Sequence, residues 1–400
     1  MANKALFRGF SIHPRQFFLI FFLILNSITW FFTILFSIAW DLPHMWLLPA
    51  ATVVSFLIGP LIAERVSRMR FLLFWILLGV ISSLFSLIMP TFGERGTTVV
   101  LIWWGFAFGI GFPSCLALVS NLTQVEERGR VGGIIFFATY AILPLFALTI
   151  GSLGASPEEL VLSSSIPLAV WRCFGFLPLL LIKVDVDTTF KPVSYSSILT
   201  RKQFLHYFFP WLIFCLVHFL TWPIIDRFFG TNFMWVLTMV ESVLGSFFCF
   251  IGGWLMDFWG RRRPILIGFV MLGLGFAALS LFTDILPAQA FYIVADGIAW
   301  GIFSVAFGPV VWGDMADHQQ SEKFYGLGSI STPLALVFAV STSSWFIALN
   351  VGNVFSLASF FLFLAVIPIF FAPELLPEKV TKERELKKYM EEVKKIAGRG

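Results

Sequence analysis

The sequence predicts an all-helical (all-α) integral membrane protein with twelve transmembrane helices in two pseudo-symmetric six-helix bundles. The prediction depends on the composition, on the number of apolar runs and on where the basic residues fall. Of 400 residues, 58% are hydrophobic and only 12% are charged, whereas a soluble domain carries about 25% charged residues. A soluble fold cannot bury that much apolar surface, and the 50 Phe and 15 Trp residues are typical of helices that face lipid. Lipid is therefore the expected solvent.

Twelve apolar runs are long enough to cross a bilayer, which takes about 20 residues. The first six are residues 16–40, 44–63, 71–91, 97–122, 131–155 and a run within 163–182. After a polar stretch, the second six are 207–225, 232–256, 264–282, 287–312, 327–350 and 354–371. The predicted organisation is an amino-terminal six-helix bundle (1–182), a central cytoplasmic loop (183–206), a carboxy-terminal six-helix bundle (207–372) and a charged cytoplasmic tail (373–400).

The basic residues predict the orientation. With twelve spans, all but three of the 27 Lys and Arg residues fall on the side that carries both termini, and the exceptions are Arg95, Arg172 and Arg227. Because basic loops stay in the cytoplasm, both termini are expected there, in a multi-pass protein of the cell membrane. One missed span would reverse the bias beyond it, so the charges support the count of twelve independently. Arg172 is expected near the membrane interface, since a sixth helix that begins at Trp171 leaves it at the edge.

A weak internal repeat relates the two halves. The pair Gly105 and Gly109 in the fourth run has the same GxxxG spacing as Gly297 and Gly301 in the tenth. In the same alignment, Glu64 after the second run corresponds to Asp257 after the eighth. Parallel repeats of this kind are typical of one class of secondary transporter fold, in which the two halves are related by an axis along the membrane normal.

The most specific motif, G-x-x-x-D-x-x-G-R-R, lies in the turn after the eighth run. Its residues are Gly253, Asp257, Gly260, Arg261 and Arg262. Gly253 permits close helix packing, Gly260 permits a tight turn, and Asp257 can pair with an arginine or with a helix N-terminus. The motif resembles motif A of the major facilitator superfamily, and that resemblance implies a facilitator fold, alternating access and a role for these residues in holding one conformation.

Other parts of the chain fit this resemblance less closely. The first-half copy of the motif has Glu64 for the aspartate and Ser67 for the turn glycine, which puts a latch in that half in doubt. Two further inner loops, 126–130 and 313–326, are similar to loops of the same family.

Ionisable residues inside the spans are candidate functional sites, because each costs about 2.5 to 3.5 kcal/mol to insert. His218, Glu241 and Asp296 share a depth of about 12 to 14 Å below the outer edge. The first and fourth helices of each half line the pathway in the resembled family, which implies a pathway role for Asn26, His218 and Asp296 and puts Glu241 on a flanking helix. Tyr292 and Trp300 share a face of the tenth helix with Asp296, and Trp30 shares a face of the first helix with Asn26, because residues four apart lie on the same side of a helix. The predicted solute and proton pathway comprises Asn26, Trp30, His218, Glu241, Tyr292, Asp296 and Trp300.

Several classes of function have no support in the sequence. It contains no phosphate-binding loop, no hydrolase or zinc-protease motif and no Cys–His ligand spacing, so neither an enzyme, a cofactor nor a metal is expected. The net charge of +4 is small and dispersed, which does not favour nucleic acid as a partner.

The sequence predicts secondary active transport of a small organic solute, coupled to protons or another ion, with membrane lipids as the remaining partner. An aromatic wall beside a midplane acid favours an amphipathic or cationic solute, of multidrug or metabolite type. The glutamine pair that sugar porters of the resembled family carry on the seventh helix is absent from residues 211–225. Two alternatives stay open: an uncoupled facilitator, and a membrane sensor or scaffold that has the transporter fold but moves no solute.

Overall fold

The structure, a computed structural model, describes residues 10–154, 156–182, 191–316, 321–347 and 349–377. Within these residues, eleven apolar helical segments of 20 to 31 residues are long enough to cross a membrane, and a shorter apolar helix, α3 (Leu47–Ala63), has 17 residues. At 1.5 Å per residue α3 is about 25 Å long, close to the thickness of the hydrocarbon layer. The twelve predicted spans are therefore all present as helices.

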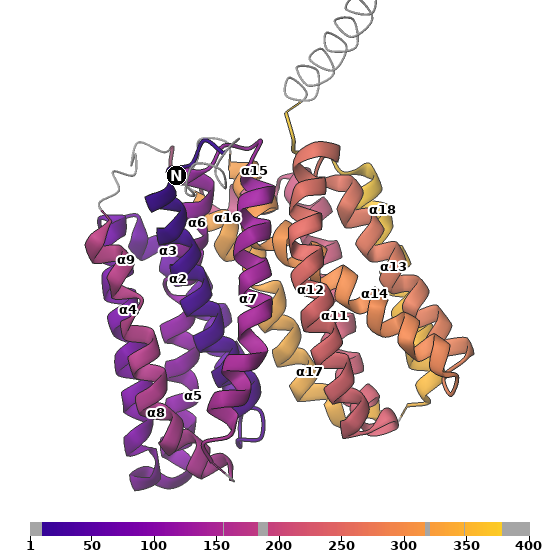
Figure 1. Cartoon of the computed structure of the whole chain (residues 1–400), viewed down its shortest axis with the longest axis horizontal. Helices are drawn as coiled ribbons and strands as arrows, with labels where there is room; N and C mark the ends of the chain where they lie inside the picture. The colour runs from indigo at the N-terminus through magenta and orange to yellow at the C-terminus, as the bar shows by residue number, and fades with distance from the viewer. Residues whose placement is uncertain (1–9, 155, 183–190, 317–320, 348, 378–400) are drawn as a thin grey trace, which may run out of the picture.

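The first six spans form one bundle, drawn in indigo to magenta in Figure 1. Several spans are built from two helical pieces. In chain order they are α2 (Pro14–Thr33) with η1 (Ile34–Ile38), α3, α4 (Arg68–Phe85) with η2 (Ser86–Phe92), α5 (Gly93–Gly109) with α6 (Phe112–Leu122), α7 (Arg128–Gly151), and α8 (Pro157–Cys173) with α9 (Phe176–Leu181).

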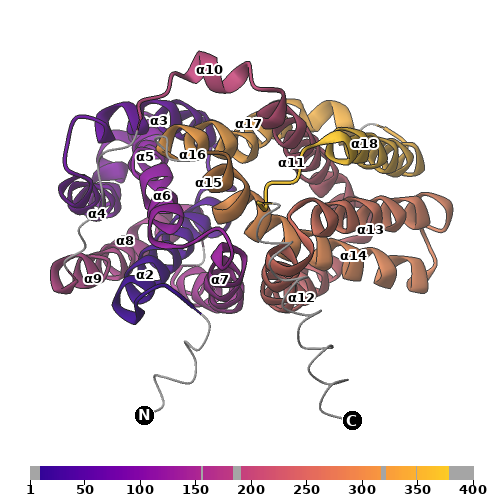
Figure 2. The same cartoon turned by 90° about the horizontal axis from the view of Figure 1, so that it is seen from above.

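The second six spans form the other bundle, drawn in pink to yellow. A short helix in the connection, α10 (Tyr195–Leu199), lies along the edge of the molecule between α3 and α17 (Figure 2). The spans are α11 (Lys202–Phe229), α12 (Thr231–Trp259), α13 (Arg262–Leu281), α14 (Leu286–Val305) with η3 (Ala306–Val310) and α15 (Val311–Ala316), α16 (Ser321–Ser329) with α17 (Ser331–Ile347), and α18 (Val351–Phe371).

The predicted repeat of glycine pairs corresponds to equivalent packing in the two halves. A Cβ atom placed on Gly105 would lie 3.0 Å from Oγ1 of Thr52, so the fourth span packs closely against α3. A Cβ atom on Gly297 would lie 2.8 Å from Cβ of Leu244, so the tenth span packs closely against α12 in the same way. In each half the fourth helix thus contacts the second at a glycine, which supports the pseudo-symmetry.

The fourth span of each half is also interrupted. In the first half the α-helix breaks between α5 and α6, where Gly111 lies against the ring of Trp75 and Pro113 lies in the first turn of the next helix. In the second half α14 passes into the π-helix η3, which contains Pro309. Such interruptions are frequent at functional sites, and both occur in the spans that contact the opposite half.

We call the inner face the side of the molecule where α2, α4, α7, α11 and α13 begin. In Figure 1 it lies at the top, where α6, α15 and α16 bring the two bundles together. This face carries the loops that the basic residues predict to be cytoplasmic. Residues 183–190 of the predicted central loop and 378–400 of the predicted tail lie outside the described residues.

Candidate functional site

The first candidate site is a group of ionisable side chains from three helices of the second half. His218 lies on α11, Glu241 on α12 and Asp296 on α14. Asp296 is fully buried, and neither carboxyl oxygen has a hydrogen-bond partner among the described residues. Buried polar groups are nearly always partnered, so this orphan carboxyl group marks a functional candidate. We call His218, Glu241, Tyr292, Asp296 and Trp300 the acid site.

Glu241 lies close to Asp296 across the contact between α12 and α14. The residue after Asp296 is Gly297, and a Cβ atom there would lie only 3.4 Å from Cα of Glu241. The negative charge of Asp296 interacts electrostatically with the Glu241 carboxyl group, and both acids interact electrostatically with the Tyr292 hydroxyl group. The ring of Tyr292 packs 4.9 Å from that of Phe276 on α13. Two carboxyl groups therefore share one electrostatic environment.

A hydrogen bond from Trp300 determines the tautomer of His218. The indole Nε1 of Trp300 donates to Nδ1 of His218 over 3.1 Å. Indole nitrogen is a donor only, so Nδ1 accepts and the neutral imidazole carries its proton on Nε2. His218 Nδ1 is also 3.9 Å from Oδ1 of Asp296. That contact is not an ion pair in this tautomer, so His218 does not neutralise Asp296.

Aromatic rings surround His218 and Trp300. The Trp300 ring meets Phe214 edge to face at 4.8 Å, and the His218 ring meets Trp222 edge to face at 5.4 Å. Trp222 stacks at 6.2 Å on Phe36 of η1, which belongs to the first half. The acid site is thus lined by rings that continue to a contact between the two halves.

The acid site also touches the first half through a tyrosine. The hydroxyl groups of Tyr140 on α7 and Ser304 on α14 are 2.7 Å apart, and a Cβ atom on Gly245 of α12 would lie 2.9 Å from the Tyr140 ring. Sequence analysis missed Tyr140 and Ser304. The chain has only six tyrosines, and one in the middle of an apolar run is a signal that could have found this contact.

Two of the predicted pathway residues lie elsewhere, inside the first half. Asn26 Nδ2 donates to the carbonyl oxygen of Trp171 at 2.6 Å, and its Oδ1 accepts from Arg172 Nη1 at 2.9 Å. The guanidinium carbon of Arg172 lies 5.1 Å from the Trp30 ring and 4.4 Å from the Trp75 ring. The structure therefore does not bring Asn26 and Trp30 together with the acid site.

The expectation that Arg172 lies at the membrane interface was wrong. Its side chain is fully buried, because the sixth span begins at Pro157 and not near Trp171. Fifteen residues of helix put Arg172 about 22 Å along the span. Sequence analysis missed this buried arginine because the start of that apolar run is polar and poorly marked.

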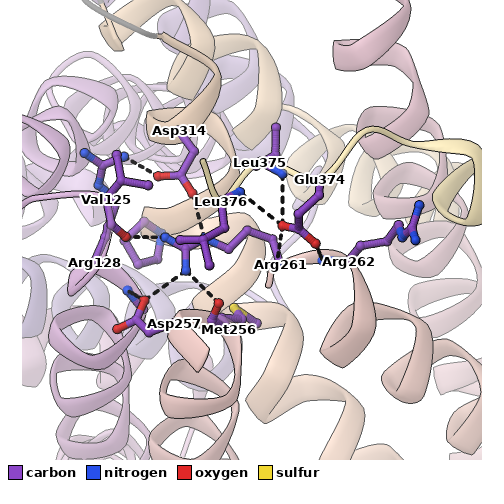
Figure 3. A network of polar contacts seen from close by, with 12 residues as sticks. Val125, Arg128, Met256, Asp257, Arg261, Arg262, Asp314, Glu374, Leu375 and Leu376 are labelled. Atoms are coloured by element: carbon purple, nitrogen blue, oxygen red, sulfur yellow. Dashed lines mark hydrogen bonds and ion pairs between the residues drawn. The ribbon is translucent and has the colours of Figure 1, made fainter. Parts of the chain in front are cut away.

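The second candidate site is the motif at the inner face, shown in Figure 3. Asp257, near the end of α12, accepts hydrogen bonds from the backbone nitrogens of Gly129 at 2.9 Å and Arg130 at 2.8 Å. These nitrogens belong to the first turn of α7, so a carboxylate from one half sits at a helix N-terminus of the other, where negative charge is stabilised.

Arg261 extends this contact to the tenth span. Its Nη1 is 2.9 Å from Oδ1 of Asp257, and its Nε is 2.7 Å from Oδ2 of Asp314 on α15. Burial alone would lower the pKa of Arg261, but Asp314 and Asp257 more than offset it and raise the pKa above its usual value. Arg128 of the first half pairs with Asp314. We call Arg128, Asp257, Arg261 and Asp314 the inner network.

The glycines of the motif have separate roles. A Cβ atom on Gly253 would lie 2.9 Å from the carbonyl carbon of Gly129 and 3.0 Å from Cα of Gly133, so α12 and α7 touch backbone to backbone. Gly260 has φ +91°, a conformation that favours glycine. This turn lets Glu374 accept a hydrogen bond from the Arg261 nitrogen at 2.7 Å.

Arg262 belongs to the carboxy-terminal connection and not to the inner network. Its Nη1 donates to the carbonyl oxygen of Ala372 at 3.2 Å.

The first-half copy of the motif also joins the two halves. Glu64 pairs with Lys323 and Arg68 pairs with Glu322, and both partners lie in α16. Lys323 donates in addition to the carbonyl oxygen of Val193 at 2.7 Å. Although its turn glycine is missing, this copy makes ion pairs between the halves at the inner face.

The comparisons with known proteins agree with this geometry. Residues 203–399 match the family model described as Major Facilitator Superfamily. Over its carboxy-terminal half, the chain is similar to the major facilitator superfamily. Members of the superfamily are transporters and not enzymes, and a search of curated proteins finds no match to this one.

Solved structures of transporters show a similar fold at low sequence identity. FucP in the outward conformation has a TM-score of 0.71 at 12% identity, with 90% of this chain and 98% of that chain covered; a second structure describes FucP as the E. coli fucose:proton symporter. The proton:xylose symporter XylE has a TM-score of 0.62 at 14% identity, with coverages of 90% and 94%. The human organic anion transporter MFSD10 has a TM-score of 0.65 at 13% identity, with coverages of 89% and 100%.

Proposed function

We propose that this protein is a secondary active transporter of the major facilitator superfamily that moves a small organic solute by alternating access, with a proton as coupling ion at the acid site. One observation carries the proposal: the buried Asp296 carboxyl group has no hydrogen-bond partner in the described structure and no cation beside it. An isolated buried carboxylate is costly, so the group needs a positive partner. A proton supplies that partner, and its movement down the proton gradient supplies the driving force.

Two features support alternating access. The inner network joins α7 of the first half to α12 and α15 of the second, which closes the inner face in the present state. FucP in the outward conformation has a similar fold, and both FucP and XylE are named as proton symporters. We propose that the inner network breaks when the halves rock, which exposes the acid site to the inner side and lets the proton leave.

The orientation is part of the proposal. The basic residues of the inner face favour a cytoplasmic position in the cell membrane. The proton would then bind from outside or from the cytoplasm according to which face is open.

The test is transport by the purified protein in proteoliposomes under an imposed pH gradient, with a panel of sugars, amino acids, organic anions and organic cations. Asp296→Asn should express normally, because it removes a charge from the membrane interior, but it should abolish accumulation while exchange persists. Asp284→Asn, an exposed acid just before α14, is the matched control and should accumulate solute like the wild type.

Two results would change the assignment. If Asp296→Asn accumulates solute with an unchanged pH profile while Glu241→Gln fails, the coupling group is on α12. If the wild type equilibrates a solute but never accumulates it, the protein is an uncoupled facilitator, and binding without any flux would indicate a sensor.

A further inference from the structure

We infer that the solute of the acid site is an organic cation that exchanges for a proton on Asp296, which makes the protein a proton–cation antiporter. The inference rests on the proposed function and names the substrate class of the same site. It comes from the balance of charge, from the polar atoms that are free to bind a solute, and from the aromatic rings nearby.

The charge at the site is one-sided. Asp296 and Glu241 supply two acidic groups, whereas His218 on α11 is held neutral by Trp300. The remaining titratable groups that face these acids are hydroxyl groups, Tyr140 from α7 and Tyr292 from α14. No Lys or Arg in the described residues forms an ion pair with either acid. Positive charge must therefore come from outside the protein.

The buried arginine of the first half cannot supply it. Arg172 is held by Asn26 and by Ser27, whose Oγ lies 2.7 Å from its Nη1, and by the two indole rings. These partners lie on α2 and α4 behind the contact between the halves. A shift of Arg172 toward Asp296 would break all of these contacts.

The polar atoms that remain free favour a cation over a sugar. A sugar needs several donors and acceptors, yet the serine hydroxyl groups around the acids already make hydrogen bonds. Ser304 bonds Tyr140, and Ser242 and Ser246 on the Glu241 helix donate to the backbone oxygens of Thr238 and Ser242 at 2.7 Å each. In the described part of this site, the orphan buried atoms are the two oxygens of Asp296. When Asp296 is ionised, these oxygens accept hydrogen bonds or pair with a cation, and they donate none.

Aromatic rings provide the other half of a cation site. Trp300 lies one helical turn from Asp296 and on the same face of α14. Its ring and that of Trp222 are partly exposed, while Phe214 packs behind Trp300. Cations bind the faces of such rings within about 6 Å, and most strongly those of tryptophan. A cation over Trp300 would also lie within reach of the Asp296 carboxylate.

The exchange can be written for Asp296 alone. The protonated carboxyl group releases its proton to water, and the resulting carboxylate pairs with the cation, so the charge of the site is the same before and after. Proton and cation thus compete for one group, and neither can be bound while the other remains. Because both are carried in opposite directions, a proton gradient drives the cation out of the compartment that is poor in protons.

The experiment uses the full-length protein in detergent, with tetraphenylphosphonium as the probe. Equilibrium binding is measured beside proton release in weakly buffered solution. We expect about one proton to be released per cation bound. The affinity for the cation should fall about tenfold for each unit by which the pH is lowered, over the range in which Asp296 is mostly protonated. Tetraphenylborate, which has the same shape and the opposite charge, and L-fucose should neither bind nor release protons.

Variants separate charge from fold. Asp296→Asn should lower the affinity for tetraphenylphosphonium by about tenfold or more and abolish proton release, whereas Asp284→Asn should match the wild type. Trp300→Ala should weaken binding but keep proton release, because the carboxyl group remains. Thermal unfolding of each variant shows whether it is folded before it is scored.

The outcomes distinguish the two proposals. If Asp296→Asn binds tetraphenylphosphonium as tightly as the wild type, or if binding releases no protons, the cation inference is wrong. If a sugar or an anion is accumulated by a pH gradient through Asp296, the proposed function stands and the inference again falls. If the cation binds with proton release but no solute crosses the membrane, the exchange of cation for proton at Asp296 stands, while the proposed transport function fails and antiport fails with it.

Discussion

Asp296 and Arg172 are both fully buried charges without an ion-pair partner in the described structure, and they differ in what surrounds them. The guanidinium group of Arg172 has side-chain oxygens of Asn26 and Ser27 on one nitrogen and two tryptophan rings beside it. Cation–π contacts are worth about 2 kcal/mol when they are desolvated, so the charge of Arg172 is largely compensated where it lies, although its Nε and Nη2 have no hydrogen-bond partner among the described residues. Asp296 has no comparable contact. This difference is why Asp296, and not Arg172, is the candidate for an exchangeable charge.

The hydrogen bond between Trp300 and His218 leads to a prediction at the residue scale. His218 should be the Nε2–H tautomer, because its Nδ1 accepts from the indole. Trp300→Phe removes the donor and should cost about 0.5 to 1.5 kcal/mol of unfolding free energy. Nitrogen NMR of protein labelled at its five histidines would report the tautomer.

The His218→Asn variant assigns the relevant NMR signal by its disappearance. A proton on Nδ1 of His218 in the wild type would contradict the tautomer, and with it the conclusion that His218 leaves Asp296 unneutralised. In Trp300→Phe we expect a mixture of tautomers, since nothing else in the described contacts fixes the ring.

At the scale of elements, we expect the contact between α7 and α12 to control whether the inner face can close. Gly129 and Gly133 on α7 meet Gly253 on α12 so closely that no Cβ atom fits. The sequence predicted a packing role for Gly253 from the motif. It could not predict the partner glycines, because 129 and 133 are ordinary helix positions until α7 is placed against α12. The sequence also could not predict that Asp257 contacts the N-terminus of α7, because several other helices begin at the same face.

Adding a methyl group at this contact should open the inner face. Gly253→Ala penalises only the closed state, by about 1 to 3 kcal/mol, which is about a 5- to 150-fold change in the balance of states. Asp257→Asn should act in the same direction but less strongly, because a charge at a helix N-terminus is worth about 0.3 to 1 kcal/mol and sometimes about 2. Spin labels at Arg65→Cys and Arg263→Cys, with the four native cysteines replaced, would measure the separation of the halves.

Gly151→Ala is the matched control, since nothing lies within 4 Å of the position that its Cβ atom would occupy. It should leave both the distance distribution and the unfolding temperature unchanged. An unaltered distribution in Gly253→Ala, in a protein that is still folded, would rule out the α7–α12 contact as the element that controls closure.

At the scale of the whole molecule, the fold follows from the sequence more completely than the site does. The apolar runs predict the number of spans, the distribution of basic residues supports that number, and the repeated glycine pairs relate the two halves. Together they predict twelve spans in two related bundles. The site depends on which faces of distant helices meet. Asp296 and His218 could be identified from the sequence because ionisable side chains are costly to insert into lipid, whereas burying Tyr140 costs little. For Asn26, the sequence does not distinguish a residue that lines a pathway from one that bonds Arg172. Only the packing of α2 against α8 separates those two cases.

The orientation of the molecule is the last prediction. The inner face carries Arg68, Lys191 and Arg262, and all but three of the 27 basic residues fall on its side of the predicted spans. Translocating loops that carry so many basic residues across the membrane is unfavourable, so the inner face should be cytoplasmic. Single cysteines at Glu158 and Arg263 are suitable reporters, because both positions are exposed and each lies at the start of its span, on opposite faces of the molecule. An impermeant maleimide applied to intact cells should modify the cysteine at Glu158 and spare the one at Arg263, and lysed cells should show both modified. The reverse pattern would invert the topology, and since the inner network would then face outward, it would also change the direction in which a proton gradient drives the solute.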